Sequence, residues 1–135
     1  MQIKPTKINS DSIYNLPSQI SNEIIWSFCE GIINYFHPLK IYLFGSYAKG
    51  DFTANSDLDL LVIIDDLNPL AFLKRRDRYS RILKVFPHKG FSLDAIVLTN
   101  KEIQKLINEN EGEWDLIIEV LNEGKVLYEQ ETEVE

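Results

Sequence analysis

The sequence predicts one α/β (α+β) domain with a small mixed β-sheet and helices mainly on one face. Apolar runs of strand length alternate along the chain with stretches in which apolar residues recur at helical spacing. The 135 residues are enough for one hydrophobic core but too few for two. A hydrophobic content of 44%, with 6 glycines and 5 prolines, is typical of a globular protein and not of a disordered one.

The two ends of the chain differ in composition from its middle. Residues 1–18 mix polar side chains with prolines and have no sustained period, so we expect a loosely ordered arm. Residues 129–135 are mostly acidic and are expected to form a frayed tail. The folded domain is therefore expected to span residues 19–128. Its first element should be a helix from Ser21 to Phe36, because the apolar residues there share one helical arc.

A strand, a tight turn, a short helix and a second strand are expected after this helix. The apolar run Ile41–Phe44 predicts the first strand, which stops at the glycine and serine of Gly45–Ser46. The short helix closes at Lys49–Asp51, and a polar loop leads into a second apolar run, Leu58–Ile64. This unit is the centre of the predicted domain.

The rest of the chain predicts helices around a third strand. Turn residues and a proline at the first helical position predict a helix from Asn68–Pro69 to about Phe86, with Phe72 and Tyr79 on its apolar arc. The third strand is expected over Phe91–Leu98. The remaining residues predict two short helices and a short strand, over Lys101–Asn108, Glu113–Asn122 and Lys125–Tyr128.

Three basic residues, Lys74, Arg78 and Arg81, are predicted to lie together on the face of the Asn68–Phe86 helix opposite its apolar arc. Such a stripe of charge is most often a solvated helix face. The alternative is a docking surface for an acidic or nucleotide-bearing partner.

Two carboxylates, Asp57 and Asp59, stand at the start of the second strand. Residues i and i+2 of an extended strand point to the same face, roughly 6 to 7 Å apart at Cα, so both side chains can converge on one metal site. Magnesium prefers such oxygen ligands, completed by water and phosphate oxygens. Gly45 lets the backbone approach a phosphate closely, and Ser46 adds a donor. Either motif alone is common, but the combination, with ten residues between Ser46 and Asp57, is much rarer.

The stretch GSYAKGDFTANSDLDLLV closely resembles the signature of the DNA polymerase β-like nucleotidyltransferase superfamily, in which Gly-Ser and a spacer precede Asp-x-Asp on the next strand. It is similar in particular to the minimal nucleotidyltransferases, small prokaryotic proteins often paired with a HEPN-domain ribonuclease toxin. The resemblance covers roughly Ile41 to Leu98. It implies that Gly45, Ser46 and Lys49 bind the nucleotide. Lys49 stands where these proteins often carry arginine, which keeps the charge but loses the bidentate fork.

Asp94 interrupts the otherwise apolar third strand. A buried, unpaired acid there would cost on the order of several kcal/mol, so it needs a cation or a cleft, although a place at a surface edge would also explain it. The resemblance implies that the superfamily's third carboxylate lies on this strand, where Asp94 is the residue that fits. By the same resemblance, Asp57, Asp59 and Asp94 are the catalytic residues and the ligands of two magnesium ions, and ATP is the substrate.

The resemblance implies a Mg²⁺-dependent enzyme that transfers AMP from ATP to a hydroxyl of a partner protein. The partner would be a HEPN ribonuclease toxin, and this chain its adenylylating antitoxin. Two alternatives remain: transfer of a nucleotide to a small molecule such as an aminoglycoside, and a non-catalytic antitoxin that acts by binding. After Asp94 only about forty residues remain, too few for a second domain with an acceptor pocket, so we expect the acceptor on another chain.

The charge and the cysteine content exclude several other classes of protein. A net charge of −7 argues against a general nucleic-acid binder, which needs an excess of lysine and arginine. Cys29 is the only cysteine, so we exclude disulfides within the chain and cysteine-based zinc sites, and expect a small buried residue. No apolar run approaches the ~20 residues of a membrane span, and the first residues do not resemble a signal peptide, so we expect a cytoplasmic protein.

Overall fold

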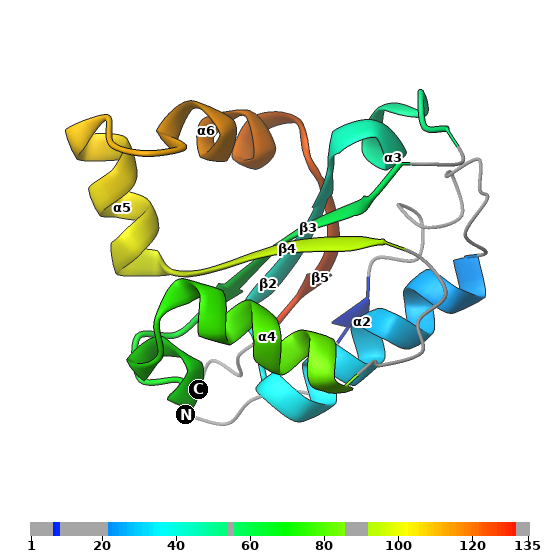
Figure 1. Ribbon diagram of the computed structural model, residues 1–135, viewed down its shortest axis with the longest axis horizontal. Coiled ribbons are helices and arrows are strands. Elements are labelled where there is room, and N and C mark those ends of the chain that lie inside the picture. The colour runs from blue at the N-terminus through cyan, green and yellow to red at the C-terminus, as the bar shows by residue number, and fades with distance from the viewer. Residues whose placement is uncertain (1–6, 9–21, 54–55, 86–91, 132–135) are drawn as a thin grey trace.

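The computed structural model describes residues 7–8, 22–53, 56–85 and 92–131 (Figure 1). The elements in these ranges alternate between strands and helices. In chain order they are β1 (Lys7–Ile8), α2 (Asn22–Phe36), β2 (Lys40–Phe44), α3 (Gly45–Lys49), β3 (Leu58–Ile64), the 3₁₀ helix η1 (Pro69–Phe72), α4 (Arg75–Val85), β4 (Leu93–Thr99), α5 (Asn100–Glu109), α6 (Trp114–Glu123) and β5 (Lys125–Glu129).

Most of the predicted elements are confirmed with bounds that differ by one or two residues. Of the predicted N-terminal arm, the structure describes only β1, which pairs with β5, so the rest of residues 1–18 lies outside the described residues. The same holds for residues 132–135 of the predicted tail. The proposed domain boundaries therefore stay a prediction. Among the helices that are described, none is both long and apolar enough to cross a membrane.

The five strands form one mixed sheet in the order β1-β5-β2-β3-β4. Strands β3 and β4 are parallel, and the other neighbouring pairs are antiparallel. A parallel pair needs a crossover connection, which the segment that contains η1 and α4 supplies. The predicted α/β fold with a small mixed sheet is therefore confirmed.

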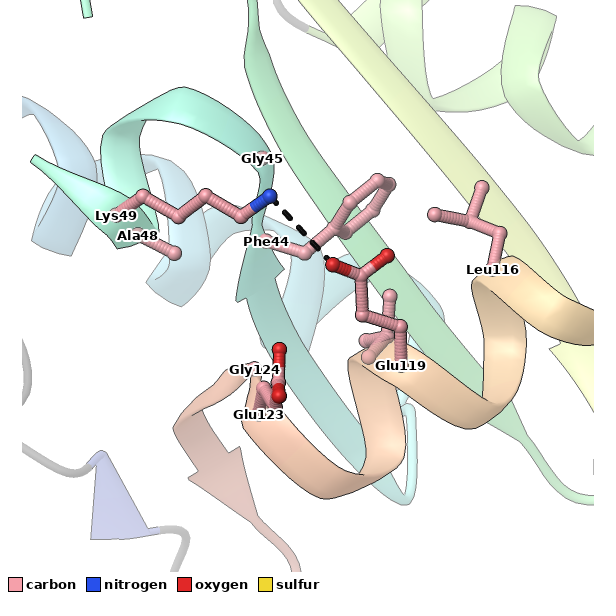
Figure 2. Close-up of a pocket in the computed structure, with 9 residues that line it drawn as sticks. Phe44, Gly45, Ala48, Lys49, Leu116, Glu119, Glu123 and Gly124 are labelled. Carbon is pink, nitrogen blue, oxygen red and sulfur yellow. Dashed lines mark ion pairs between the residues drawn. The ribbon is translucent and has the colours of Figure 1, made fainter. Parts of the chain in front are cut away.

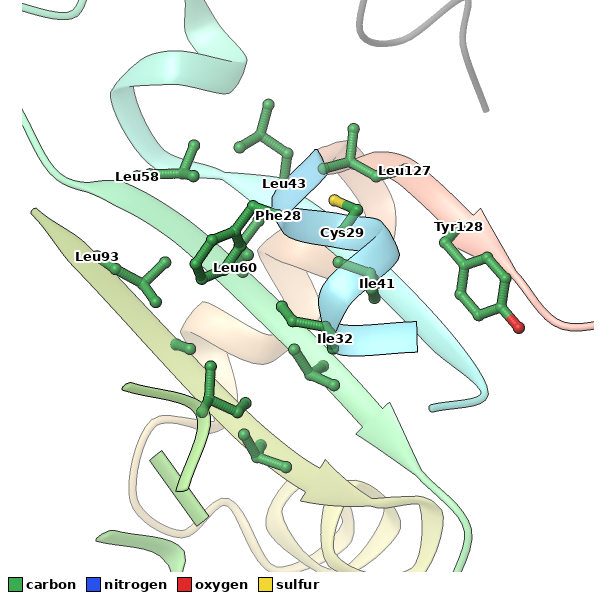
Figure 3. Packing of buried hydrophobic residues seen from close by; sticks show 14 of the residues in the cluster. Phe28, Cys29, Ile32, Ile41, Leu43, Leu58, Leu60, Leu93, Leu127 and Tyr128 are labelled. Carbon is green, nitrogen blue, oxygen red and sulfur yellow. The ribbon is translucent and has the colours of Figure 1, made fainter. Parts of the chain in front are cut away.

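Helices cover both faces of the sheet, and not mainly one face as the sequence predicted. Helices α2 and α4 lie on one side, and α5 and α6 lie on the other (Figure 1). The reason is the alternation of side chains along β3. Leu60 and Val62 join a large core cluster with α2, part of which Figure 3 shows, whereas Leu61 and Ile63 join a smaller cluster with α5 and α6. A strand that is apolar on both faces needs cover on both.

Cys29 is a buried residue of the large cluster, as the sequence predicted (Figure 3). Burial, and to a smaller extent the charge of Glu30, raise the pKa of the Cys29 thiol to about 12. Because the thiolate and not the thiol is the nucleophile, this side chain is unreactive and serves packing.

The prediction of one continuous helix from Asn68–Pro69 to about Phe86 is wrong. The Asn68 side chain accepts a hydrogen bond from the backbone N–H two residues further on, at 3.0 Å, and so caps the short helix η1. Leu73 is extended (φ −96°, ψ 157°), which interrupts the helix before α4 begins. Phe72 is consequently 78% exposed and does not join the core. The predicted end at Phe86 lies outside the described residues.

The predicted stripe of Lys74, Arg78 and Arg81 is not one solvated helix face. Lys74 and Arg81 are exposed, but Arg78 is buried, with 3% of its surface accessible. A long cationic side chain is buried only where its charge and its donors find partners. Arg78 therefore has a structural role that the sequence pattern alone did not indicate.

Arg78 ties α4 to β4 and α5. Its guanidinium contacts both carboxylate oxygens of Glu102, with N···O distances of 2.6 and 3.1 Å. Burial alone would raise the pKa of Glu102, but hydrogen bonds from Arg78 and from Thr99 lower it below its usual value. Thr99 and Glu102 also form the capping box at the start of α5. Arg78 further donates to the backbone carbonyls of Ala71, Leu73 and Val97, at 3.2, 3.1 and 3.0 Å.

Replacing Arg78 by methionine is expected to lower the free energy of unfolding by about 2 kcal/mol. The variant would leave three carbonyls and the Glu102 carboxylate without their donor, and since Glu102 is about one-third exposed the loss falls below the ~3–5 kcal/mol of a fully buried pair. Urea unfolding measures it. Arg81→Met, on the exposed part of the same helix, is the matched control and should change stability by less than about 0.5 kcal/mol. Equal losses in the two variants would contradict this role of Arg78.

Candidate active site

Asp59 and Asp94 lie side by side on neighbouring strands. In the parallel pairing of β3 and β4, Asp59 is the Cα partner of Asp94. Leu58 and Leu60 point into the large cluster, so Asp59 between them points to the opposite face of the sheet. The neighbours of Asp94 on both sides in β4 also belong to that cluster, and Asp94 therefore points to the same face as Asp59. The pairing brings together two acids that are far apart in the sequence.

Asp57 completes a group of three carboxylates at this end of the sheet. It lies one residue before β3 and two residues before Asp59, and its charge acts on the Asp59 carboxylate. Burial of the half-buried Asp59 side chain, followed by the charges of Asp94 and Asp57, raises the pKa of Asp59 to about 6. The three acids are therefore close enough to repel one another, and a bound cation would relieve that repulsion.

Gly45 brings the other half of the sequence motif against Asp59. Its φ of +73° lies in the left-handed region that favours glycine. A Cβ atom at this position would lie 2.1 Å from Asp59 Oδ2, so the carboxylate occupies the space that any other side chain would fill. Ser46 follows in α3, where the stacking of Tyr47 on Phe52, with ring centroids 4.5 Å apart, fixes the short helix. The structure thus joins the Gly-Ser turn and the acidic pair in space.

Lys49 of α3 forms an ion pair with α6. Its ammonium group pairs with Glu119 of α6, at 3.5 Å, and both side chains are largely exposed (Figure 2). Exposed pairs of this kind contribute at most about 1 kcal/mol, so Lys49 can exchange this partner for a phosphate at little cost. Its predicted role in nucleotide binding stays a prediction.

Tyr79 of α4 is a neighbour of the site that the sequence pattern had placed on an apolar arc. Its hydroxyl donates to the Leu93 carbonyl at 2.6 Å, directly before Asp94. Burial, and then the charges of Asp94 and Asp57, raise the pKa of this hydroxyl. Strand β4 is at the edge of the sheet, so this hydrogen bond satisfies a carbonyl that no further strand reaches. In the sequence, this contact is indicated only by the hydroxyl that Tyr79 adds to an otherwise apolar helical arc.

The three aspartates carry carboxylate oxygens, which are the kind of ligand that magnesium prefers. Within the described ranges, no group of three or more His, Cys, Asp or Glu side chains is arranged to hold a metal ion. Magnesium does not need such a cage, because it commonly binds one or two carboxylates and completes its shell with water and substrate phosphate oxygens. Asp59 and Asp94, side by side on one face, would supply one or two such oxygen ligands.

Replacing Gly45 by alanine is expected to lower nucleotide transfer per folded molecule by about tenfold, because the new Cβ displaces the Asp59 carboxylate. Gly112→Ala is the matched control. Gly112 also has a positive φ, +55°, but a Cβ there would meet only Leu106 at an ordinary 3.5 Å. Single-turnover assays, normalised by the folded fraction from circular dichroism, separate the two effects. Loss of stability in both variants with unchanged turnover would make Gly45 a turn residue only.

The chain matches known nucleotidyltransferases over most of its length. Residues 29–133 match the family model "Polymerase beta, Nucleotidyltransferase". Two proteins of Methanocaldococcus jannaschii, both named "Putative protein adenylyltransferase", are also similar. One is 38% identical over 89 residues, 66% of this chain and 77% of the relative, and the other is 35% identical over 78 residues, 58% of this chain and 73% of the relative.

A crystal structure of a "putative nucleotidyltransferase" from Sulfolobus solfataricus matches with a TM-score of 0.46 and 25% identity, over 62% of this chain and 70% of that one. The family assignment does not depend on it. The family model spans the Gly-Ser turn, the acidic pair and the strand with Asp94, which are the features that the structure brings together. The chain is therefore a nucleotidyltransferase and belongs to the polymerase beta nucleotidyltransferase family.

Proposed function

We propose that this nucleotidyltransferase transfers AMP from ATP to a hydroxyl group of a partner protein in a magnesium-dependent reaction. The observation that carries the proposal is the pairing of Asp59 with Asp94 while Gly45 lies against the Asp59 carboxylate, because it gathers acids and a phosphate-binding turn at one place. The choice of AMP and of a protein acceptor is supported by the similarity to two proteins named as protein adenylyltransferases.

In this proposal each residue of the site has a separate task. Asp57, Asp59 and Asp94 would hold magnesium, which when bound neutralises phosphate charge and polarises the α-phosphate. The backbone at Gly45 and the Ser46 hydroxyl hold the triphosphate. Asp94 accepts the proton of the acceptor hydroxyl as its oxygen forms a bond to the α-phosphorus and the bond to pyrophosphate breaks.

The acceptor is proposed to come from another chain. The described residues after Asp94 form the end of β4, α5, α6 and β5, which pack on the sheet or belong to it. None of these elements builds a second domain around the acids. A HEPN ribonuclease toxin is the partner that we propose, with a tyrosine hydroxyl as the acceptor and with this chain as its antitoxin.

The test is to incubate the purified pair with ATP and magnesium and to measure the intact mass of both proteins. We expect the partner to gain the mass of one or more AMP units and to lose its ribonuclease activity. The Asp57→Asn, Asp59→Asn double variant is the control and should leave the partner unmodified. Inhibition without a mass change would support an antitoxin that acts by binding. Transfer to a small molecule instead would contradict a protein acceptor.

A further inference from the structure

A pocket of about 190 Å³ lies between α3 and α6, beside the Gly-Ser turn (Figure 2). Of the residues that line it, only Gly45 has a task in the function proposed above. We refer to it as the α3–α6 pocket. Its lining comes from the end of β2, from α3 and from one side of α6, namely Phe44, Gly45, Ala48, Lys49, Leu116, Glu119, Val120, Glu123 and Gly124.

The α3–α6 pocket lies next to the row of acids. Phe44 in β2 is the Cα partner of Asp59 in β3, just as Asp59 is the partner of Asp94 in β4. Neighbouring strands are roughly 4.8 Å apart, so Asp94, Asp59 and the Phe44 floor of the pocket follow one another across the sheet. Gly45 belongs to both places, since it lines the pocket and also contacts the Asp59 carboxylate. A ligand held at Gly45 by its phosphates can therefore reach the pocket.

The wall formed by α6 is fixed close to the sheet by Gly124. A Cβ at this position would lie 2.5 Å from the Val120 carbonyl oxygen and 3.2 Å from that of Leu43. A larger residue here would clash with the last turn of α6 and crowd the Leu43 carbonyl of β2. Glycine at this position therefore lets α6, which forms one wall of the pocket, end close to the sheet.

The size and the chemistry of the α3–α6 pocket suit a planar heterocycle. Its volume is below the ~300–1,000 Å³ of sites that enclose whole drug-sized ligands, so it holds a ring and not a complete nucleotide. Phe44, Ala48, Leu116 and Val120 give it apolar walls. Glu119 adds a carboxylate, which accepts hydrogen bonds and donates none when ionised.

We propose that the α3–α6 pocket receives the base of the nucleotide, with Glu119 as the acceptor for an exocyclic amine of that base. The inference rests on the proposed function and adds to it the place and the chemistry of base selection. Lys49 and Glu119 pair across the pocket. Binding of the triphosphate draws Lys49 to the phosphates and frees Glu119 for the base.

The first test fills the pocket. Ala48→Leu places a larger apolar side chain among the walls. Ala71→Leu, the same exchange at a half-buried alanine of η1 that does not line the pocket, is the matched control. Calorimetry with magnesium present measures the binding of ATP and of inorganic tripolyphosphate, which lacks ribose and base. We expect Ala48→Leu to weaken ATP binding by about tenfold or more, which corresponds to at least about 1.4 kcal/mol, because the ring no longer fits. Tripolyphosphate binding should not change, because this compound has no ring. Circular dichroism verifies the fold of each variant.

The possible results separate the base site from the proposed transfer. Unchanged ATP binding by a folded Ala48→Leu variant, or equal affinity of the wild-type protein for ATP and tripolyphosphate, would overturn the base site but leave the proposed transfer standing. If the wild-type protein bound neither compound, the proposed function itself would fail, and the base site with it.

The second test addresses the amine. Inosine triphosphate differs from ATP at the base, where a carbonyl replaces the amine, so it presents an acceptor where Glu119 needs a donor. We expect the wild-type protein to prefer ATP and Glu119→Gln to lower the ratio of the two affinities by about tenfold, because the amide can donate to the carbonyl. Glu119→Gln also removes the ion-pair partner of Lys49, which would change both affinities alike. The ratio of the two affinities is therefore not affected by it. Glu109→Gln, at an exposed glutamate of α5, is the matched control. An unchanged ratio in Glu119→Gln would remove Glu119 from base selection.

Discussion

Replacing Asp57 and Asp59 together by asparagine is expected to abolish nucleotide transfer and, at the same time, to raise the melting temperature of the metal-free protein. Asp59 points to the face that carries Asp94, and the charge of Asp57 acts on Asp59 as well. Neutral amides remove that repulsion and also remove two of the oxygen ligands that magnesium would use. Activity and stability should therefore change in opposite directions, which simple damage to the fold would not produce.

The gain in stability should depend on pH in a defined direction. The folded-state pKa of Asp59 is about 6, above its ordinary value of 3.8, so folding favours the protonated form. The stability linked to this proton is fully present below pH 3.8 and is lost as the pH rises through 6. The double variant has no carboxyl group at position 59, so it does not lose this stability as the pH rises. We expect its melting temperature to exceed that of the wild-type protein at about pH 8 and to match it near pH 4.

Thermal unfolding in the presence of a chelator measures this difference. Asp51→Asn is the matched control, because Asp51 is exposed just after α3. It should change neither the transfer nor the melting temperature. Full transfer by the double variant would refute the assignment of the acidic pair, and a stabilisation that persisted near pH 4 would show that charge repulsion is not its cause.

The local parts of the site could be predicted from the sequence, and the distant contacts could not. The Gly-Ser turn and the start of a strand at the acidic pair are set by neighbours in the chain, and the structure has both. Asp94 was identified through the family resemblance. Its position opposite Asp59 depends on the register of β3 and β4, which the long crossover between them leaves open.

Helical periodicity in the sequence could not predict that Arg78 is buried. A period of about 3.6 residues tells which side chains share a face, but it does not tell how the helix is rotated on the sheet. Arg78 turns inward because Glu102, 24 residues away, meets it there. The continuous apolar run of β3 did carry a signal that was missed, since a strand without polar alternation indicates helices on both faces.

Replacing Asp94 by asparagine is expected to leave ATP affinity nearly unchanged and to slow single-turnover transfer by about 10²-fold or more. In the proposed reaction, Asp57, Asp59 and the turn at Gly45 still hold the triphosphate in this variant. The proton acceptor and one of the magnesium ligands are lost together, and each contributes to the chemical step more than to binding. The amide has nearly the same shape as the carboxylate that it replaces, so the pairing of β3 and β4 should persist.

Nucleotide binding and single-turnover transfer measured on the same Asp94→Asn preparation decide between a catalytic and a merely exposed residue. Asp94 is an exposed residue of an edge strand, and an acid at such a place can exist without any function. Asp77→Asn, at an exposed acid of α4, should change neither quantity. If Asp94→Asn also changed neither, Asp94 would leave the site, and a two-carboxylate arrangement of Asp57 and Asp59 would replace it. If both quantities fell in parallel, Asp94 would act in binding the nucleotide and not as the proton acceptor.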